Sequence, residues 1–184
     1  MADLISTSSL APSMEHLKAL IRDVPDFPRP GILFRDVTPL LRDPAALRQA
    51  VAHFAERYRD AGIGAVAGIE SRGFIFGAPL AMELGVGFVP IRKVGKLPAE
   101  KIDLEYALEY GTAALEIHVD AVSPGERVLL IDDLLATGGT AQAAAKLVET
   151  IGGEVASVAF LIELEFLAGR ERLGGHDVYS VLRY

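Results

Sequence analysis

The 184-residue chain is long enough for one domain with a sizeable core, and its hydrophobic content of 51% argues against disorder for most of it. Its formal net charge of −7 argues against a general nucleic-acid binder, which needs a basic face, but leaves room for a local basic pocket. The absence of cysteine excludes disulfides and thiol chemistry.

The sequence predicts neither a secretory signal nor a membrane-spanning segment. The N-terminal residues contain neither the basic nor the apolar region of a secretory signal, and the longest apolar stretch, near 155–162, is too short to span a membrane. We therefore expect a cytoplasmic protein with one domain over 1–184. Residues 1–12 are expected to form a flexible tail.

Turn, capping and apolar residues predict alternating helices and strands along the chain. Ser13 is expected to cap a short helix over 14–22, and the prolines of 25–31 argue against regular strand pairing there. Asp43 and Pro44 are typical of an N-cap followed by the first helical residue. The alternation predicts an open, mainly parallel α/β sheet with helices on both faces. Strands are expected at 65–69, 86–91, 113–119, 127–131, 154–162 and 176–182, helices at 44–61, 74–84, 140–151 and 166–173, and irregular structure over 92–110.

The most informative segment combines a buried strand, two carboxylates and a small loop. The apolar run 128–131 is typical of a strand covered on both faces, and it places Asp132 and Asp133 at the carboxyl end, where open α/β sheets bind ligands. Residues 137–140 offer backbone N–H groups and two hydroxyls before a helix, whose N-terminus favours anions. This arrangement predicts phosphate in the loop and sugar hydroxyls on the carboxylates.

A simple turn and two well-known nucleotide-binding motifs fit this segment less well. An ordinary turn between a strand and a helix also contains Gly and Thr, but it does not require the whole ordered string. A Walker phosphate loop is excluded because the chain has no G-x-x-x-x-G-K-[ST] motif. A dinucleotide-binding fingerprint is excluded because no G-x-G-x-x-G follows a predicted strand.

The segment resembles the phosphoribosyl-pyrophosphate (PRPP) motif of type I phosphoribosyltransferases, and its form Asp-Asp-Leu-Leu-Ala-Thr-Gly-Gly-Thr is similar to that of the adenine phosphoribosyltransferases in particular. The resemblance implies the type I fold, with an N-terminal hood that binds the base and a flexible catalytic loop. It also implies a set of PRPP-binding residues in this segment: Asp132, Asp133, Ala136, Thr137, Gly138, Gly139 and Thr140.

A second motif, Glu70-Ser71-Arg72-Gly73, directly follows a predicted strand. Arg72 can bind a pyrophosphate with two parallel hydrogen bonds, and Ser71 and Gly73 leave backbone donors accessible. Taken alone, a surface arginine beside a turn would be an equally good interpretation. The family resemblance implies that Ser71 and Arg72 bind PRPP, that Arg72 takes part in catalysis, and that the Glu70–Ser71 peptide is cis.

A third motif places Arg92, Lys93 and Lys96 within five residues of an acidic protein. A solvated basic loop explains such a cluster in most proteins. Cations near the carboxyl end of the sheet would, however, neutralise a departing pyrophosphate. The resemblance implies that Lys93 and Lys96 contact PRPP and that Arg92 reaches across a dimer interface, so that a homodimer would be the functional unit.

A fourth motif, Tyr106-Ala-Leu-Glu109-Tyr110-Gly, lies in the segment 93–112. From composition alone, Glu109 would be an exposed residue of a hairpin. The resemblance implies instead that 93–112 is the flexible catalytic loop, that Glu109 handles a proton at the imidazole edge of the purine, and that Tyr110 covers the site. Glu105 matches no family role.

The segment 25–36 is the expected base-binding loop. Phe34 offers an aromatic face, and base stacking is commonly worth about 1–3 kcal/mol. Without the neighbouring motifs, Phe34 would be interpreted as a core residue. Adenine needs one acceptor and one donor, which backbone groups can supply. The resemblance implies that Leu33 and Arg35 provide these main-chain contacts.

The sequence contains no zinc pattern, because His53, His118 and His176 are scattered and cysteine is absent. Mg²⁺ is implied by the phosphorylated substrate, held mainly through PRPP and through water by Asp132 and Asp133, with no direct protein ligand. We expect a purine salvage enzyme that converts adenine and PRPP to AMP and pyrophosphate. Its partners would be these substrates and a second copy of the chain, with no nucleic acid and no membrane.

Two alternative functions remain open on the sequence alone. The enzyme could act on another base, such as a 6-oxopurine or orotate, although the segment around Phe34 favours adenine. The chain could also be a PRPP-sensing regulator, although such a protein would normally carry an added nucleic-acid-binding element, and this chain shows neither an extra domain nor a basic face.

Overall fold

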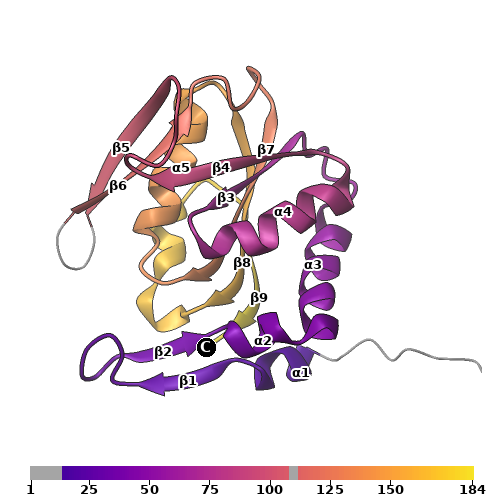
Figure 1. Cartoon of the computed structure of the whole chain (residues 1–184), viewed down its shortest axis with the longest axis vertical. Helices are drawn as coiled ribbons and strands as arrows, with labels where there is room; N and C mark the ends of the chain where they lie inside the picture. Colours follow the sequence, from indigo (N-terminus) through magenta and orange to yellow (C-terminus); the bar gives the residue numbers. More distant parts are fainter. Residues whose placement is uncertain (1–13, 108–111) are drawn as a thin grey trace, which may run out of the picture. The chain divides into compact units, whose positions relative to one another are not determined.

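The computed structural model describes residues 14–107 and 112–184, which fall into two compact units that divide after Gln49 (Figure 1). The expectation of one domain over 1–184 stays a prediction, and the tail 1–12 and the cap Ser13 lie outside the described residues. No helix in the described ranges is long and apolar enough to cross a membrane.

The first unit contains a hairpin that the sequence did not predict. Strands β1 (Arg22–Pro25) and β2 (Leu33–Asp36) pair antiparallel, so the expectation that the prolines of 25–31 would prevent pairing is wrong at Pro25, whereas 26–31 form no strand. Pro25 is the last residue of its strand, where a missing N–H does no harm. The helices of this unit are α1 (Met14–Ala19), which is shorter than expected, α2 (Thr38–Arg42), which was not predicted, and the start of α3 (Pro44–Tyr58).

Asp43 caps α3, as the sequence predicted. Its Oδ1 accepts hydrogen bonds from the backbone N–H groups of Ala45 at 2.8 Å and Ala46 at 3.0 Å, which satisfies two donors that the helix itself leaves free. The backbone N–H groups lower the pKa of Asp43, so the cap is ionised at neutral pH.

The second unit is built on a seven-stranded sheet in the order β5-β6-β4-β3-β7-β8-β9. The strands from β4 to β9 in this order run parallel, whereas β6 pairs antiparallel with both β4 and β5. The prediction of a mainly parallel sheet is thus confirmed. The strands are β3 (Ala65–Ile69), β4 (Gly87–Lys93), β5 (Lys101–Ala107), β6 (Thr112–His118), β7 (Arg127–Leu135), β8 (Glu154–Glu163) and β9 (Val178–Arg183).

Two regions of this unit differ from the prediction. Irregular structure was expected over 92–110, but β5 lies there and pairs with β6 along its whole length. Its apolar residues Ile102, Leu104 and Tyr106 alternate with charged ones and pack on the core, a half-buried pattern that the high charge concealed. The expected helix at 166–173 is instead two short 3₁₀ helices, η1 (Glu165–Leu167) and η2 (Gly169–Leu173).

Helices cover both faces of the sheet (Figure 1). The alanine-rich helix α5 (Gly139–Thr150) shares one core cluster with Ile69, Leu130 and Phe160. Helix α4 (Arg72–Leu84) contributes no residue to that cluster and packs on β3, β4 and β7, where the Phe74 and Phe88 rings meet edge to face at 5.7 Å. The sheet is therefore the middle layer, and its strand ends position the site described below.

Candidate active site

Three adjacent parallel strands bring three of the predicted motifs to one place. In the register of β3, Gly68 lies opposite Pro90 of β4 and Ile131 of β7, so the residues that follow reach the same level at the carboxyl edge. There they line a cavity of about 160 Å³. Its walls are formed by Glu70, Ser71, Arg72, Lys93, Asp132 and Asp133.

The start of α4 lies against the carboxyl end of β7 because residue 73 is glycine. A Cβ at Gly73 would lie 2.6 Å from the carbonyl oxygen of Ile131 and 3.2 Å from Oδ1 of Asp132. This close approach places Arg72, the first residue of α4, beside Asp133, and the two side chains form an ion pair. The Asp133 carboxylate is buried whereas the guanidinium remains half exposed, so Arg72 can still meet an anion in the cavity.

The two adjacent carboxylates differ in their surroundings. The backbone N–H of Asp133 donates to Oδ1 of Asp132 at 2.9 Å. Burial and the neighbouring Asp133 charge nevertheless raise the pKa of Asp132 well above its ordinary value. A group that donates hydrogen bonds or carries positive charge relieves this repulsion, so the pair is suited to sugar hydroxyls or a hydrated cation.

Glu70 orders the end of β4. The Glu70–Ser71 peptide is cis, as the family resemblance implied, and the Glu70 N–H extends the ladder by donating to Ile91 O at 2.8 Å. Its carboxylate accepts two bonds of 3.2 Å from Arg92 and one of 3.0 Å from the Lys93 N–H. Burial opposes ionisation of Glu70, but these donors outweigh it and lower its pKa.

A residue that orders a loop near the site, and that the sequence did not predict, is Glu116 of β6. Its side chain is fully buried and accepts three backbone hydrogen bonds from the turn after β4, from Gly95 at 3.0 Å, Lys96 at 2.8 Å and Leu97 at 2.5 Å. Lys101 lies 3.7 Å away. Burial of Glu116 is outweighed by these donors, so its pKa is lowered. The carboxylate therefore fixes the turn that carries Lys96, a link that no local motif reveals.

The glycine-rich segment 136–140, here called the phosphate loop, lines a second cavity of about 70 Å³. Asp132 lines both cavities, so they adjoin. Gly138 has a φ of +83°, and α5 begins at the next residue. The first N–H groups of α5 have no acceptor within the helix, so they are available to an anion. The Thr140 hydroxyl donates a hydrogen bond to the Tyr106 hydroxyl at 3.3 Å, which links the loop to β5.

The remaining predicted site residues lie elsewhere or outside the described ranges. Glu109 and Tyr110 belong to 108–111, which is not described. Within this chain Arg92 contacts Glu70 and, at 2.9 Å, the carbonyl oxygen of Lys96, and neither Arg92 nor Lys96 lines the cavity.

The expected base-binding residues belong to the hairpin of the first unit. Phe34 packs edge to face on Phe27, with ring centroids 5.2 Å apart, and the side chain of Arg35 pairs with Asp23. Leu33 and Arg35 are two residues apart in β2, so their backbone groups point to the same edge of the strand.

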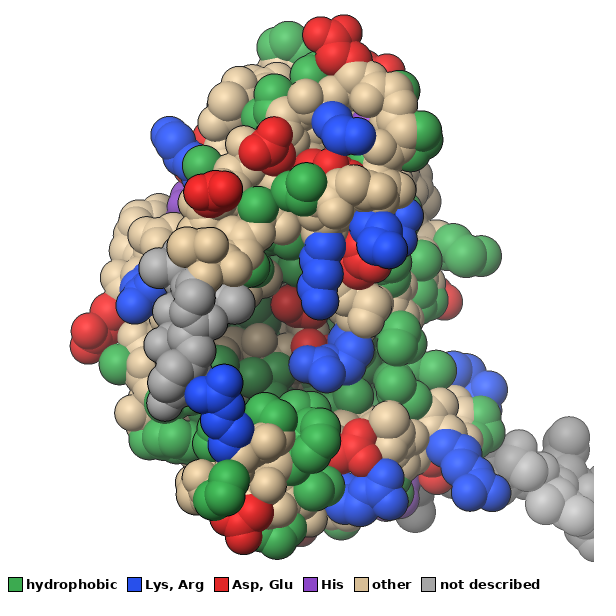
Figure 2. Space-filling model, turned by 60° about the vertical axis from the view of Figure 1, so that its left-hand side comes forward, with side chains coloured by type: hydrophobic (Ala, Val, Ile, Leu, Met, Phe, Trp, Pro, Cys, Tyr) green, Lys and Arg blue, Asp and Glu red, His purple; other side chains and the backbone are tan. Residues whose placement is uncertain are grey.

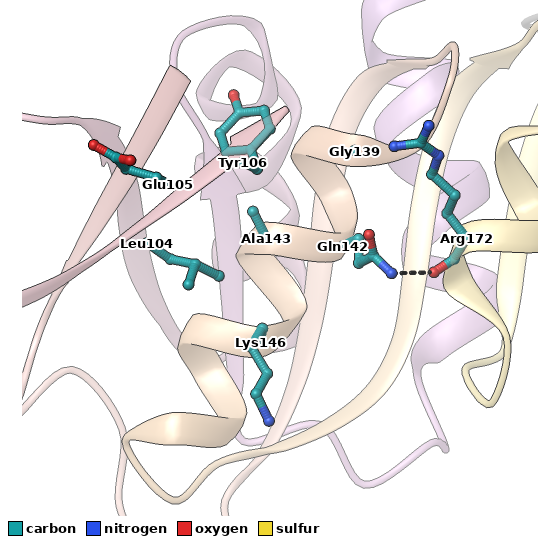
Figure 3. Close-up of a pocket in the computed structure, with 8 residues that line it drawn as sticks. All are labelled: Leu104, Glu105, Tyr106, Gly139, Gln142, Ala143, Lys146 and Arg172. Carbon is teal, nitrogen blue, oxygen red and sulfur yellow. Dashed lines mark hydrogen bonds between the residues drawn. The ribbon is translucent and has the colours of Figure 1, made fainter. Parts of the chain in front are cut away.

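A larger cavity of about 400 Å³ lies between β5 and α5 and borders the phosphate loop at Gly139 (Figure 3). It is lined by Leu104 and Tyr106 on one side and by Gln142 and Lys146 on the other. On the face drawn in Figure 2, basic side chains lie beside acidic ones rather than forming one continuous basic area. The largest of these three cavities is therefore not the one at which the predicted motifs converge.

Comparison with known proteins decides the family. The model of the phosphoribosyl transferase domain matches residues 37–179. Adenine phosphoribosyltransferase from Nitrosococcus oceani is 59% identical over 171 residues, which cover 93% of this chain and all of the relative. The chain belongs to the adenine phosphoribosyltransferase family. The resemblance inferred from the motifs is confirmed.

Solved structures of the adenine phosphoribosyltransferase family have the same fold. The enzyme from Thermoanaerobacter pseudethanolicus has a TM-score of 0.91 and 53% identity, covering 94% of this chain and 100% of its own. The enzyme from Saccharomyces cerevisiae, in complex with an imino-altritol bisphosphate and adenine, has a TM-score of 0.86 and 41% identity, covering 91% and 97%. The predicted fold class is thus confirmed.

Replacing Glu116 with Gln tests whether its charge fixes the turn. An amide would present N–H groups to one of the backbone donors, so we expect the free energy of unfolding at about pH 7 to fall by about 1–3 kcal/mol. Because the folded pKa of Glu116 lies below its ordinary value of 4.5, the stabilisation is present above that value and is lost as the pH falls through the folded pKa.

Urea unfolding at a series of pH values measures this difference. The difference in free energy of unfolding between the wild type and Glu116→Gln should be largest near neutral pH and should become smaller in acid. Glu105→Gln, which changes an exposed carboxylate on β5, is the matched control and should leave stability nearly unchanged. A Glu116→Gln variant as stable as the control at neutral pH would contradict the role given to Glu116.

Proposed function

We propose that the chain transfers the 5-phosphoribosyl group of PRPP to adenine, giving AMP and pyrophosphate in purine salvage. One observation carries the proposal beyond the likeness to relatives. Parallel strand ends bring the acidic pair Asp132 and Asp133, the cations Arg72 and Lys93, and the phosphate loop to two adjoining cavities. PRPP combines vicinal hydroxyls, a pyrophosphate and a 5-phosphate, which these three kinds of group would recognise.

Each part of PRPP then has a binding partner in this chain. The backbone N–H groups of the phosphate loop, Ala136 to Thr140, would hold the 5-phosphate at the start of α5. Asp132 and Asp133 would accept hydrogen bonds from the ribose hydroxyls, which offsets the burial and the repulsion by Asp133 that raise the Asp132 pKa. Ser71, Arg72, Lys93 and Lys96 would bind the pyrophosphate.

The same groups would stabilise the transition state. As the bond to pyrophosphate breaks, positive charge develops on the sugar ring and negative charge on the leaving group. Arg72 and Lys93 would meet the growing negative charge, and because they are held in place beforehand, little reorganisation is required. Arg72 is directed by its ion pair with Asp133, and the Lys93 backbone by its bond to Glu70.

The donor set also fits Mg²⁺ that enters with PRPP. The described residues contain no group of three His, Cys, Asp or Glu side chains that could hold a metal by themselves. Two adjacent carboxylates beside a phosphate site are nevertheless what Mg²⁺ uses when substrate oxygens and waters supply its other ligands. Asp132 and Asp133 would hold it through water. Bound there, Mg²⁺ would neutralise pyrophosphate charge.

The adenine contacts are proposed on the first unit and on the catalytic loop. Phe34 would stack on the base, while backbone groups of Leu33 and Arg35, on one strand edge, would pair with its amino group and ring nitrogen. The complex of the yeast relative with adenine supports this choice of base. Glu109 would manage the purine proton, and Tyr110 would help to exclude water.

A homodimer is proposed as the functional unit, with Arg92 directed toward the neighbouring site. In this chain Arg92 already lies at the end of β4, between Glu70 and the turn of Lys96. The segment 93–112 is proposed as the flexible catalytic loop. A cytoplasmic location and the absence of nucleic-acid and membrane partners stay predictions from the sequence.

The proposal is tested by assaying AMP formation from adenine, PRPP and Mg²⁺, with hypoxanthine, guanine and orotate in parallel. We expect rapid synthesis with adenine alone, because the backbone donor and acceptor of β2 match the adenine edge. Turnover with a different base instead of adenine would show that the enzyme is specific for that base. PRPP binding without turnover on any base would instead support a sensor.

The Glu109→Gln variant tests the catalytic loop. Loss of a general acid or base typically lowers the rate by about 10²–10⁴-fold, so we expect kcat to fall by that factor with a smaller effect on KM. Steady-state assays of AMP formation measure it. Glu105→Gln, four residues earlier, should retain wild-type kcat. Wild-type turnover in Glu109→Gln would remove Glu109 from the mechanism.

A further inference from the structure

The segment after residue 165, which carries no sequence motif, lies directly behind the phosphate loop. We propose that residues 168–172, here called the support turn, position the phosphate loop for binding the 5-phosphate of PRPP. The residues of the support turn are positioning residues, because they act through the backbone of the loop. The identity of the ligand rests on the proposed function, whereas the contact between the two segments does not.

The two backbones touch with no side chain between them. A Cβ at Gly169 would lie 2.1 Å from the carbonyl oxygen of Ala136 and 3.0 Å from Cδ1 of Leu135. A Cβ at Gly138 would in turn lie 2.4 Å from the carbonyl oxygen of Gly169. Gly169 does not have a positive φ, so the contact alone requires glycine there. The loop and the support turn are therefore complementary surfaces.

An ion pair between the buried carboxylate of Glu163 and the partly exposed guanidinium of Arg170 fixes the support turn to the sheet. Nε and Nη2 of Arg170 donate to the two carboxylate oxygens of Glu163 at 2.6 and 2.7 Å, and Nη1 donates to the carbonyl oxygen of Val178 at 2.6 Å. Glu163 is the last residue of β8 and is 3% exposed. This planar fork joins the turn to β8 and β9 and gives Gly169 little freedom to move away from the loop.

Further hydrogen bonds connect the same region to both ends of the phosphate loop. Before the loop, the Leu164 N–H donates to the carbonyl oxygen of Leu135 at 2.9 Å. After the loop, the Gln142 side chain on the first turn of α5 donates to the carbonyl oxygen of Arg172 at 3.0 Å (Figure 3). The loop is thus held by hydrogen bonds at its two ends and by the backbone contact with Gly169 in between.

This support has a consequence for binding. Several backbone N–H groups hold a phosphate well only if they converge before it arrives, and losing one hydrogen bond to such a charged group weakens binding by about 10- to 100-fold. If the support turn keeps the N–H groups of 136–140 in place, disturbing the contact should weaken PRPP binding more than it slows the chemical step.

The Gly169→Ala variant tests this, with Gly174→Ala as the matched control. A Cβ at Gly174 would meet only Glu171 O, at 3.5 Å, which is an ordinary contact. We expect Gly169→Ala to raise the KM and Kd for PRPP by about 10- to 100-fold, with a smaller change in kcat. Gly174→Ala should stay within about twofold of the wild type, a change worth about 0.4 kcal/mol.

Hydrogen exchange of the 136–140 amides gives a readout that needs no ligand. Exchange in the phosphate loop should be faster in Gly169→Ala than in Gly174→Ala, while the sheet strands exchange alike. Wild-type KM together with wild-type exchange in Gly169→Ala would overturn the inference. If the wild type fails to bind PRPP, the proposed function fails, and the exchange data alone decide whether the turn supports the loop.

A second variant covers the case in which Gly169→Ala does not fold. Arg170→Lys keeps the charge but loses the two-pronged pairing with Glu163. Like Gly169→Ala, it should raise the KM for PRPP and speed hydrogen exchange in the phosphate loop. Unchanged KM and exchange in folded Arg170→Lys would overturn the role of the support turn.

Discussion

The register of three parallel strands is the constraint on which the candidate site depends. Because β3 lies between β4 and β7 and pairs in parallel register with both, the residues after Ile69, Ile91 and Ile131 all lie at the carboxyl edge of the sheet. Distant parts of the sequence thereby supply Arg72, Lys93 and the acidic pair to one cavity. A shift of one strand by one residue would turn its side chains to the other face and disperse the group.

Two buried carboxylates, Glu116 and Glu163, and the partly buried Glu70 hold the polar segments that leave this sheet edge. Glu70 binds Arg92 and the Lys93 backbone, Glu116 binds three N–H groups of the following turn, and Glu163 binds Arg170 behind the phosphate loop. All three pKa values are lowered, because their donors outweigh the burial that opposes ionisation. The loops are therefore ordered by internal anions, while Arg72 and Lys93 line the cavity.

Sequence reasoning succeeded where a local pattern carries the structure. The apolar run before Asp132 predicted a central parallel strand, and Asp43 predicted the start of α3. It failed for β5, where charged residues alternate with apolar ones, and for the hairpin at 22–36, where prolines concealed the pairing. Glu116 and Gly169 could not have been found, because their importance lies in contacts with segments far along the chain.

A crystal structure of the protein with AMP bound would test most directly whether the strand ends and the phosphate loop form the nucleotide site. We predict the phosphate on the backbone N–H groups of 137–140 and the ribose hydroxyls within hydrogen-bonding distance of Asp132 and Asp133. AMP bound elsewhere, for example in the cavity between β5 and α5, would contradict the assignment.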